Sequence, residues 1–252
     1  MPELAIVLPT YNEVDNLGLL VPELEGLDVD LHVLVVDDNS QDRTHQVARE
    51  LSDAFGNVTV VGRPGKMGLG SALRVGLKEA LATGARYVIT MDADCSHDPR
   101  DVPRMLEVIR GGPADLVQGS RYVDGGGMRG LAFSRRFSSR AANLLYHWCA
   151  GAPHESTNNF RVFTRRAASL VAARAKGRDY EFVPEAMLLV LAAGLKVEEV
   201  PILFSGRVRG DSKLGTKQAV RGIASIFSAS LQYRLHLGRF ARRPVSDGGP
   251  VE

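Results

Sequence analysis

The first 120 residues alternate short runs of β-branched and aliphatic residues with longer amphipathic stretches. Four of the five short runs are almost continuous Val, Ile and Leu, which is typical of strands covered on both faces. Alternating strands and helices predict the α/β class, with a mostly parallel sheet flanked by helices. The strands are expected at 4–8, 32–36, 58–61, 87–91 and 115–118, and the helices at 13–25, 42–55, 69–83 and 101–110.

The carboxyl ends of these five strands carry polar, charged or glycine-rich residues. Ligands of open parallel sheets bind beyond this edge. One polar strand end is ordinary turn chemistry, but five on one edge predict a binding site. They read Pro9-Thr10-Tyr11-Asn12-Glu13, Asp37-Asp38-Asn39-Ser40, Pro64-Gly65-Lys66-Met67-Gly68-Leu69-Gly70, Asp92-Ala93-Asp94 and Gly119-Ser120-Arg121-Tyr122.

Asp92-Ala93-Asp94 has the most definite chemistry of these strand ends. Two carboxylates one residue apart at a turn can converge on one hard cation. Mg²⁺ and Mn²⁺ prefer carboxylate oxygens, often with substrate phosphate completing the shell. The alternative is a pair of solvated loop acids. The apolar strand before the motif and the nearby Asp37-Asp38 pair favour a metal site.

Two further strand ends leave alternatives open. One or both of Asp37 and Asp38 are expected to face a ligand, while Ser40 or Asp42 starts the following helix. Residues 65–70 match neither the phosphate loop G-x-x-x-x-G-K-[ST] nor the dinucleotide fingerprint G-x-G-x-x-G. They predict either a ligand loop or a flexible start of a helix.

Charge is divided unevenly along the chain. Residues 1–115 hold 19 acidic and 10 basic residues, a net charge of −9, whereas residues 116–252 hold 10 acidic and 21 basic residues, a net charge of +11. The asymmetry predicts an anionic partner for the second half, either a nucleic acid, an anionic membrane surface or a phosphorylated substrate. A solvated basic face is the alternative.

The second half has a different pattern from the first. Gly125-Gly126-Gly127 predicts a mobile loop. Helical spacing of apolar residues recurs over 216–237, with basic residues on both flanks. Further helices are expected at 134–150, 166–175 and 182–193, a strand at 196–204, and a disordered tail at 239–252.

Targeting and cysteine signals are sparse. No uncharged run reaches the roughly 20 apolar residues that a membrane-spanning helix needs, and the N-terminus resembles no signal peptide. Cys95 and Cys149 cannot form a disulfide framework, and they fit a reducing compartment.

Taken in order, the strand ends resemble the inverting, metal-dependent glycosyltransferases of family 2, which have the GT-A fold. Glu199-Val200-Pro201-Ile202 and Arg207, followed by Gly210-Asp211-Ser212-Lys213-Leu214-Gly215, narrow the resemblance to the dolichyl-phosphate and polyprenyl-phosphate mannose synthase group. The resemblance implies a catalytic domain at 1–215, with a nucleotide-sugar half at 1–120 and an acceptor half at 121–215. An amphipathic helix at 216–238 and a tail at 239–252 would follow.

The resemblance implies roles for the positions that match its motifs. The nucleotide sugar would be bound by Pro9, Tyr11, Glu13, Asp37, Asp38, Lys66, Gly68 and Asp92. Asp92 and Asp94 would bind Mg²⁺ or Mn²⁺, and Asp94 is expected to be catalytic. Phosphate groups of acceptor and donor would be held by Arg121, Arg135, Arg207 and Lys213, with Arg136 and Arg140 as rivals of Arg135.

The implied reaction moves a mannosyl residue from GDP-mannose to a dolichyl or polyprenyl phosphate with inversion. A phosphate monoester carries about −1.5 to −2 charges near pH 7 and is already a nucleophile, so the reaction needs positioning and charge compensation and no strong base. The enzyme would lie peripherally on the cytoplasmic face of the membrane. The helix at 216–238 would be interfacial or packed on the core, and a membrane-anchoring partner protein stays open.

Three positions depart from the family's pattern. Ser96 stands where the family has Gln and is a shorter, weaker metal ligand. Glu155 replaces an Asp and reaches further. Asn159 replaces a Gly, which implies either a donor other than GDP-mannose or a left-handed backbone position that Asn tolerates.

Other functions are weighed against this one. A related family 2 enzyme would use a UDP-sugar, either glucose or an N-acetylhexosamine. A non-catalytic nucleotide-sugar-binding subunit is disfavoured by the intact Asp92, Asp94, Arg121 and Lys213. An NAD-dependent oxidoreductase lacks its fingerprint here, and the basic residues are not interleaved with aromatic residues as nucleic-acid binding would require.

Overall fold

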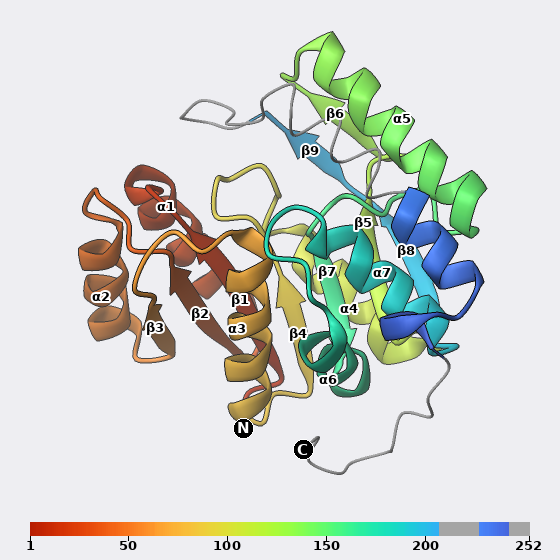
Figure 1. Cartoon of the computed structure of the whole chain (residues 1–252). Coiled ribbons are helices and arrows are strands. Elements are labelled where there is room, and N and C mark those ends of the chain that lie inside the picture. The colour runs from red at the N-terminus through yellow and green to blue at the C-terminus, as the bar shows by residue number, and fades with distance from the viewer. Residues whose placement is uncertain (207–226, 242–252) are drawn as a thin grey trace.

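A computed structural model describes residues 1–206 and 227–241, which form two sheets with surrounding helices (Figure 1). The seven-stranded sheet has the order β3-β2-β1-β4-β7-β5-β8, and β7 runs antiparallel to both neighbours. Strands β6 and β9 pair in parallel as a second sheet. The strands are β1 (Leu4–Thr10), β2 (Leu31–Asp37), β3 (Val58–Gly62), β4 (Tyr87–Thr90), β5 (Leu116–Ser120), β6 (Gly127–Arg129), β7 (Arg161–Thr164), β8 (Val197–Pro201) and β9 (Leu203–Ser205). The helices are α1 (Val14–Glu25), α2 (Thr44–Phe55), α3 (Leu69–Ala82), α4 (Asp101–Gly111), α5 (Phe133–Ala150), α6 (Arg165–Arg174), α7 (Phe182–Ala192) and the 3₁₀ turn η1 (Gly238–Phe240).

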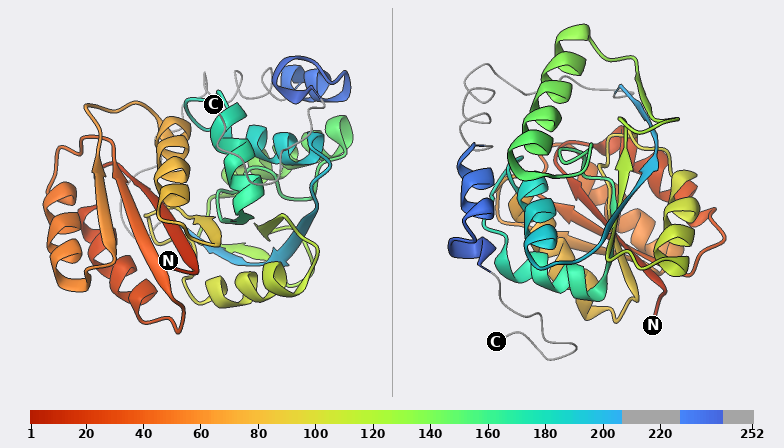
Figure 2. Two further views of the ribbon diagram at one scale, coloured as in Figure 1. Left: turned by 90° about the horizontal axis from the view of Figure 1, so that it is seen from below. Right: turned by 90° about the vertical axis from the view of Figure 1, so that its right-hand side faces the viewer.

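The large sheet divides the apolar core into two layers. Successive side chains of a strand point to opposite faces, so Ala5 and Val7 of β1 enter one layer while Ile6 and Leu8 enter the other. Helices α3, α6 and α7 cover the first layer, and α1 and α4 cover the second (Figure 2). The predicted sheet with helices on both sides is therefore confirmed.

The expected elements form, with three differences. The expected strand at 196–204 divides at Ile202, so that β8 joins the large sheet and β9 joins the small one. The loop expected to be mobile at 125–127 ends at Gly127, the first residue of β6. Strand β7 was not predicted. Its four residues begin with the charged Arg161, and the run shows no strand pattern.

The end of the described chain packs against the core. Residues 227–234 are helical, and 216–226 of the expected helix lie outside the described residues. A disordered tail was expected from 239, but Phe240 is fully buried beside Tyr233. Arg239 pairs with Glu185 at 2.6 Å, and the Arg174 guanidinium donates to the Ala241 carbonyl at 2.8 Å. Residues 239–241 are therefore packed against the core, and 242–252 of the expected tail lie outside the described residues.

Within 1–206 and 227–241, none of the helices combines the length and the apolar character needed to cross a bilayer.

Replacing Phe240 with Ala should lower the free energy of unfolding by about 3–5 kcal/mol, because it empties a fully buried aromatic site. Urea denaturation followed by circular dichroism measures this change. Phe55→Ala is the matched control, because Phe55 is 41% exposed at the end of α2 and should cost far less. Equal losses in the two variants would contradict the packing of Phe240.

Candidate active site

An open cleft lies beyond the carboxyl ends of β1, β2 and β4. It is lined by eight residues that the sequence predicts to bind nucleotide sugar or metal: Pro9, Tyr11, Glu13, Asp38, Lys66, Gly68, Asp92 and Asp94. They come together because β3, β2, β1 and β4 are adjacent parallel strands whose carboxyl ends share one edge.

Asp38 fixes the glycine-rich loop at the cleft. Its carboxylate accepts the backbone N–H groups of Met67 and Gly68 at 3.0 and 3.1 Å and pairs with the buried Arg63 guanidinium. Burial raises the pKa of the Asp38 carboxyl, while the charge of Arg63 and the two N–H bonds oppose that shift. Arg63 carried no sequence signal, because it follows β3 outside every motif.

Asp37 takes a different position from Asp38 and does not line the cleft. It is 1% exposed, and its carboxylate accepts hydrogen bonds from the Ser40 hydroxyl at 2.5 Å and from the Thr10 hydroxyl at 3.2 Å. The ring of His45 lies 3.5 Å from the same carboxylate. Of the two adjacent acids, Asp38 therefore faces the cleft and Asp37 holds the turn after β2.

One wall of the cleft comes from a segment that sequence reasoning missed. Asp179 and Tyr180 line it, although they lie between α6 and α7 and follow no strand. Glu185 holds this segment by accepting the N–H groups of Lys176 and Gly177 at 3.0 and 2.7 Å. A polar loop between two helices gave no signal that it reaches the sheet edge.

Glycine is needed where this wall meets the glycine-rich loop. Gly68 has a φ of +94°, and a Cβ there would lie 2.4 Å from the Arg178 carbonyl oxygen. A Cβ on Gly70 would lie 2.4 Å from that of Phe182. Close packing against the segment before α7 therefore requires glycine at 68 and 70.

Asp92 and Asp94 stand in a turn held by neighbouring polar groups. The Asn159 amide donates to the Asp92 carboxylate at 3.1 Å, and the Asp92 N–H donates to His97 Nδ1 at 3.3 Å. The Ser96 N–H donates to the Asp94 carboxylate at 3.1 Å. Asn159 is absent from the positions with positive φ, so the left-handed alternative for this departure is wrong. Its side chain instead orients a predicted metal ligand.

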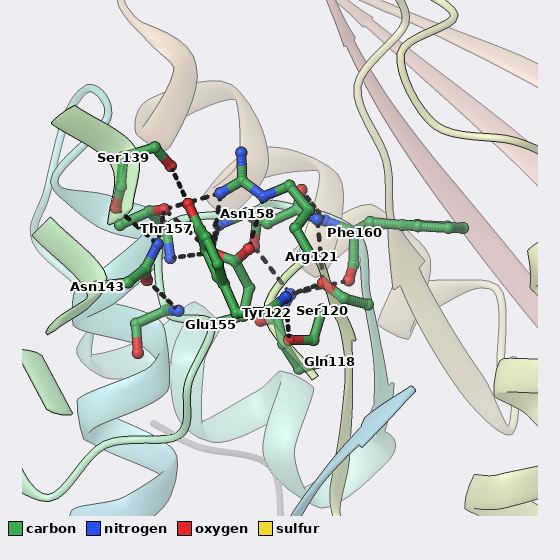
Figure 3. Close-up of polar contacts among 12 residues, drawn as sticks. Gln118, Ser120, Arg121, Tyr122, Ser139, Asn143, Glu155, Thr157, Asn158 and Phe160 are labelled. Atoms are coloured by element: carbon green, nitrogen blue, oxygen red, sulfur yellow. Dashed lines mark hydrogen bonds and ion pairs between the residues drawn. The ribbon is translucent and has the colours of Figure 1, made fainter. Parts of the chain in front are cut away.

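Arg121, a predicted phosphate ligand, is bound by side chains within the protein (Figure 3). Its Nε and Nη2 donate to the Glu155 carboxylate at 2.6 and 2.9 Å, and Nη2 also reaches the Thr157 hydroxyl at 3.1 Å. Burial by itself lowers the pKa of Arg121, but the charge and hydrogen bonds of Glu155 outweigh burial and keep it above its usual value. Within the part of the chain that the structure describes, Nη1 of Arg121 has no hydrogen-bond partner.

The segment containing Glu155 is anchored by two elements, β8 and α5. Glu199 of β8 accepts the Glu155 N–H at 2.9 Å. Asn143 of α5 accepts the Ser156 N–H at 2.7 Å and donates to the Thr157 hydroxyl at 2.9 Å. These contacts explain Glu199, whose place in the family's motif gave no chemistry by itself.

Buried Arg161 supports the same segment from within the sheet. Its guanidinium donates to Gln118 at 2.5 Å, to the Ser156 carbonyl at 2.8 Å and to the Val183 carbonyl. Burial lowers the pKa of Arg161 to about 9, against the opposing charge of Glu155. Three acceptors therefore hold a charged side chain inside the protein.

Of the remaining predicted phosphate ligands, the structure describes Arg135. Arg135 is half-buried on α5 and does not line the cleft. Arg207 and Lys213 lie outside the described residues.

Known proteins are similar to this chain in sequence. The family model for glycosyl transferase family 2 matches residues 5–170. The polyprenol monophosphomannose synthase of Mycolicibacterium smegmatis is 35% identical over 237 residues, covering 93% of this chain and 89% of that protein. The chain belongs to glycosyltransferase family 2. This glycosyltransferase is also 37% identical over 212 residues to the undecaprenyl-phosphate mannosyltransferase of Micrococcus luteus, covering 82% of this chain and 86% of that protein.

Solved structures share the fold of this glycosyltransferase. Glucosyl-3-phosphoglycerate synthase from Mycobacterium tuberculosis, in complex with Mn²⁺ and uridine diphosphate, has a TM-score of 0.67 and 20% identity, covering 91% of this chain and 80% of that chain. A mannosyltransferase from Pyrobaculum calidifontis, in complex with GDP-Man and Mn²⁺, has a TM-score of 0.59 and 17% identity, covering 94% of this chain and 71% of that chain. These likenesses confirm the GT-A fold.

Replacing Glu155 with Gln should lower the free energy of unfolding by about 3–5 kcal/mol, because it leaves Arg121 buried without a counter-charge. Urea denaturation gives the value. Glu3→Gln is the matched control: Glu3 also accepts two hydrogen bonds from one arginine, Arg110, but at the surface, and it should cost less than about 1 kcal/mol. A small loss in Glu155→Gln would show that the buried pair does not hold the acceptor side together.

Proposed function

We propose that this glycosyltransferase transfers a mannosyl residue from GDP-mannose to a dolichyl or polyprenyl phosphate, with inversion at the sugar carbon. The observation that carries the proposal is the cleft in which Asp92 and Asp94 lie with the residues that end β1 and β2. The names of both curated relatives support the sugar and the acceptor class.

The residues of the cleft fit a divalent cation. Asp92 and Asp94 offer hard carboxylate oxygens on one cleft wall, which suits Mg²⁺ or Mn²⁺. Among residues 1–206 and 227–241, no cluster of three or more His, Cys, Asp or Glu side chains is suited to hold an ion by itself. Asp92 and Asp94 would hold the metal, which when bound would supply charge neutralisation to the leaving diphosphate.

Donor binding is assigned to the cleft residues at the ends of β1 and β2. Pro9, Tyr11, Glu13 and Asp38 would receive the base and ribose. Lys66 Nζ lies 4.2 Å from the centre of the Tyr11 ring, which keeps a positive charge at the mouth of the cleft for the anionic diphosphate.

Acceptor chemistry needs no general base. An oxygen of the lipid phosphate would form the bond to the sugar carbon, the bond from that carbon to the diphosphate would break, and no proton would move. Arg121 would present Nη1 to the lipid phosphate while Glu155 holds its other nitrogens. Arg135, Arg207 and Lys213 are proposed as further phosphate ligands.

The acceptor class also implies where the enzyme works. Polyprenyl chains reside in membranes, so we assign this glycosyltransferase to the cytoplasmic face as a peripheral protein. A membrane-anchoring partner is compatible with this assignment.

A transfer assay tests the donor, acceptor and metal together. Radiolabelled GDP-mannose, a polyprenyl phosphate and Mn²⁺ should give label in the lipid fraction, and EDTA should abolish it. No label with GDP-mannose, but label with UDP-glucose or a UDP-N-acetylhexosamine, would replace the proposed donor. No label with any donor would overturn the enzymatic role.

Asp94→Asn should reduce kcat by at least about a hundredfold, because it removes charge that would hold the metal against the diphosphate. Asp53→Asn on α2, remote from the cleft, is the matched control and should leave kcat unchanged. Activity at the normal level in Asp94→Asn would remove Asp94 from the metal site.

Asn159→Gly should weaken Mn²⁺ binding about tenfold, because Asp92 loses the amide that orients its carboxylate. Titration of Mn²⁺ in the presence of GDP, followed by electron paramagnetic resonance, measures affinity without turnover. Unchanged affinity would show that the amide does not position the metal ligand.

A further inference from the structure

Helix α5 carries an apolar stripe that no described part of the chain covers. Phe133, Phe137, Leu144 and Trp148 are 81%, 67%, 55% and 73% exposed. They are spaced by four, seven and four residues, so they lie on one face of the helix. Large exposed apolar patches of this kind mark interaction surfaces.

The charges around the stripe indicate what covers it. Residues 125–154 contain four arginines and no acidic residue. Arg136 and Arg140 are exposed on the same helix as the stripe. Exposed aromatic side chains flanked by arginines are typical of helices that lie in the interface of an anionic bilayer.

A second apolar segment extends this surface. Arg234 donates to the Trp148 carbonyl at 3.0 Å, which places the helical residues 227–234 beside the end of α5, as Figure 2 also shows. Phe227 and Leu231 of this segment are 52% and 60% exposed. The apolar area therefore spans two neighbouring helices.

The opposite face of α5 bonds directly to the acceptor side. Ser139 lies 2.8 Å from the Tyr122 hydroxyl, and Asn143 donates to Thr157, which in turn accepts from Arg121 (Figure 3). One helix thus joins the exposed stripe to the arginine assigned to the lipid phosphate.

We propose that the stripe Phe133, Phe137, Leu144 and Trp148 docks this glycosyltransferase onto an anionic lipid bilayer and sets Arg121 beside the membrane surface. The proposal rests on the proposed lipid-phosphate acceptor. The sequence left the helix at 216–238 as either interfacial or packed on the core, whereas this proposal places the principal membrane contact on α5.

Vesicle flotation of the full chain tests the docking surface. The wild type should bind phosphatidylcholine vesicles containing phosphatidylglycerol more tightly than vesicles of phosphatidylcholine alone. The double variant Phe137→Ser/Trp148→Ser should bind the anionic vesicles at least about tenfold more weakly. The matched control Leu19→Ser/Phe55→Ser changes two exposed apolar residues on α1 and α2 and should bind like the wild type. Unchanged binding in the α5 variant would overturn the proposal.

The double variant Arg136→Gln/Arg140→Gln tests whether the arginines beside the stripe select anionic lipid. This variant should lose the preference for anionic vesicles, and wild-type binding should weaken as salt rises. A preference that survives both changes would contradict the charge argument. Light scattering in solution tests whether a second copy of this chain covers the stripe instead of a membrane. A wild-type dimer that becomes monomeric in Phe137→Ser/Trp148→Ser would overturn membrane docking.

Assays with two acceptor substrates distinguish a failure of this inference from a failure of the proposed function. With a short, water-soluble isoprenyl phosphate, Phe137→Ser/Trp148→Ser should transfer sugar at the wild-type rate, whereas with a polyprenyl phosphate in anionic vesicles it should be at least about tenfold slower. Equal losses with both acceptors would overturn docking. Absence of transfer by the wild type with either acceptor would overturn the proposed function, while flotation would still decide the docking surface.

Discussion

The buried ion pair between Arg121 and Glu155 connects most of the proposed acceptor side. Arg121 follows β5, and Glu155 belongs to the segment before β7. The N–H of Glu155 is held by Glu199 of β8. The Thr157 hydroxyl accepts hydrogen bonds from both Arg121 and Asn143, which links the ion pair to α5. A charge this deeply buried is stable only with its partner, so these elements hold one another in a fixed arrangement. The outer face of α5 is thereby fixed relative to Arg121.

The donor side depends instead on close backbone approach. Gly68 and Gly70 let the loop after β3 touch the segment before α7, and Glu185 holds that segment through two backbone amides. Arg239 pairs with the same Glu185, so the end of the described chain supports the cleft wall from behind. The two halves of the site are thus built differently, with packed glycines on the proposed donor side and a buried charge network on the proposed acceptor side.

Much of the site followed from local pattern. Short aliphatic runs predicted parallel strands, and the ends of adjacent parallel strands must meet at one edge of the sheet. For this reason Tyr11, Asp38, Lys66, Asp92 and Asp94 could be assigned to one cleft before any coordinates were known. The departure at Asn159 was visible in the sequence, but its hydrogen bond to Asp92 was not.

The sequence by itself determined the α/β class, the family motifs and the edge of the sheet that carries the cleft, because these depend on spacing along the chain. Only the tertiary structure decided that Asp37 turns inward, that Tyr180 reaches the cleft, and that Arg121 is paired with Glu155. It also decided which face of α5 stays exposed. These outcomes depend on contacts between segments far apart in the chain, and the spacing of residues along the chain does not predict such contacts.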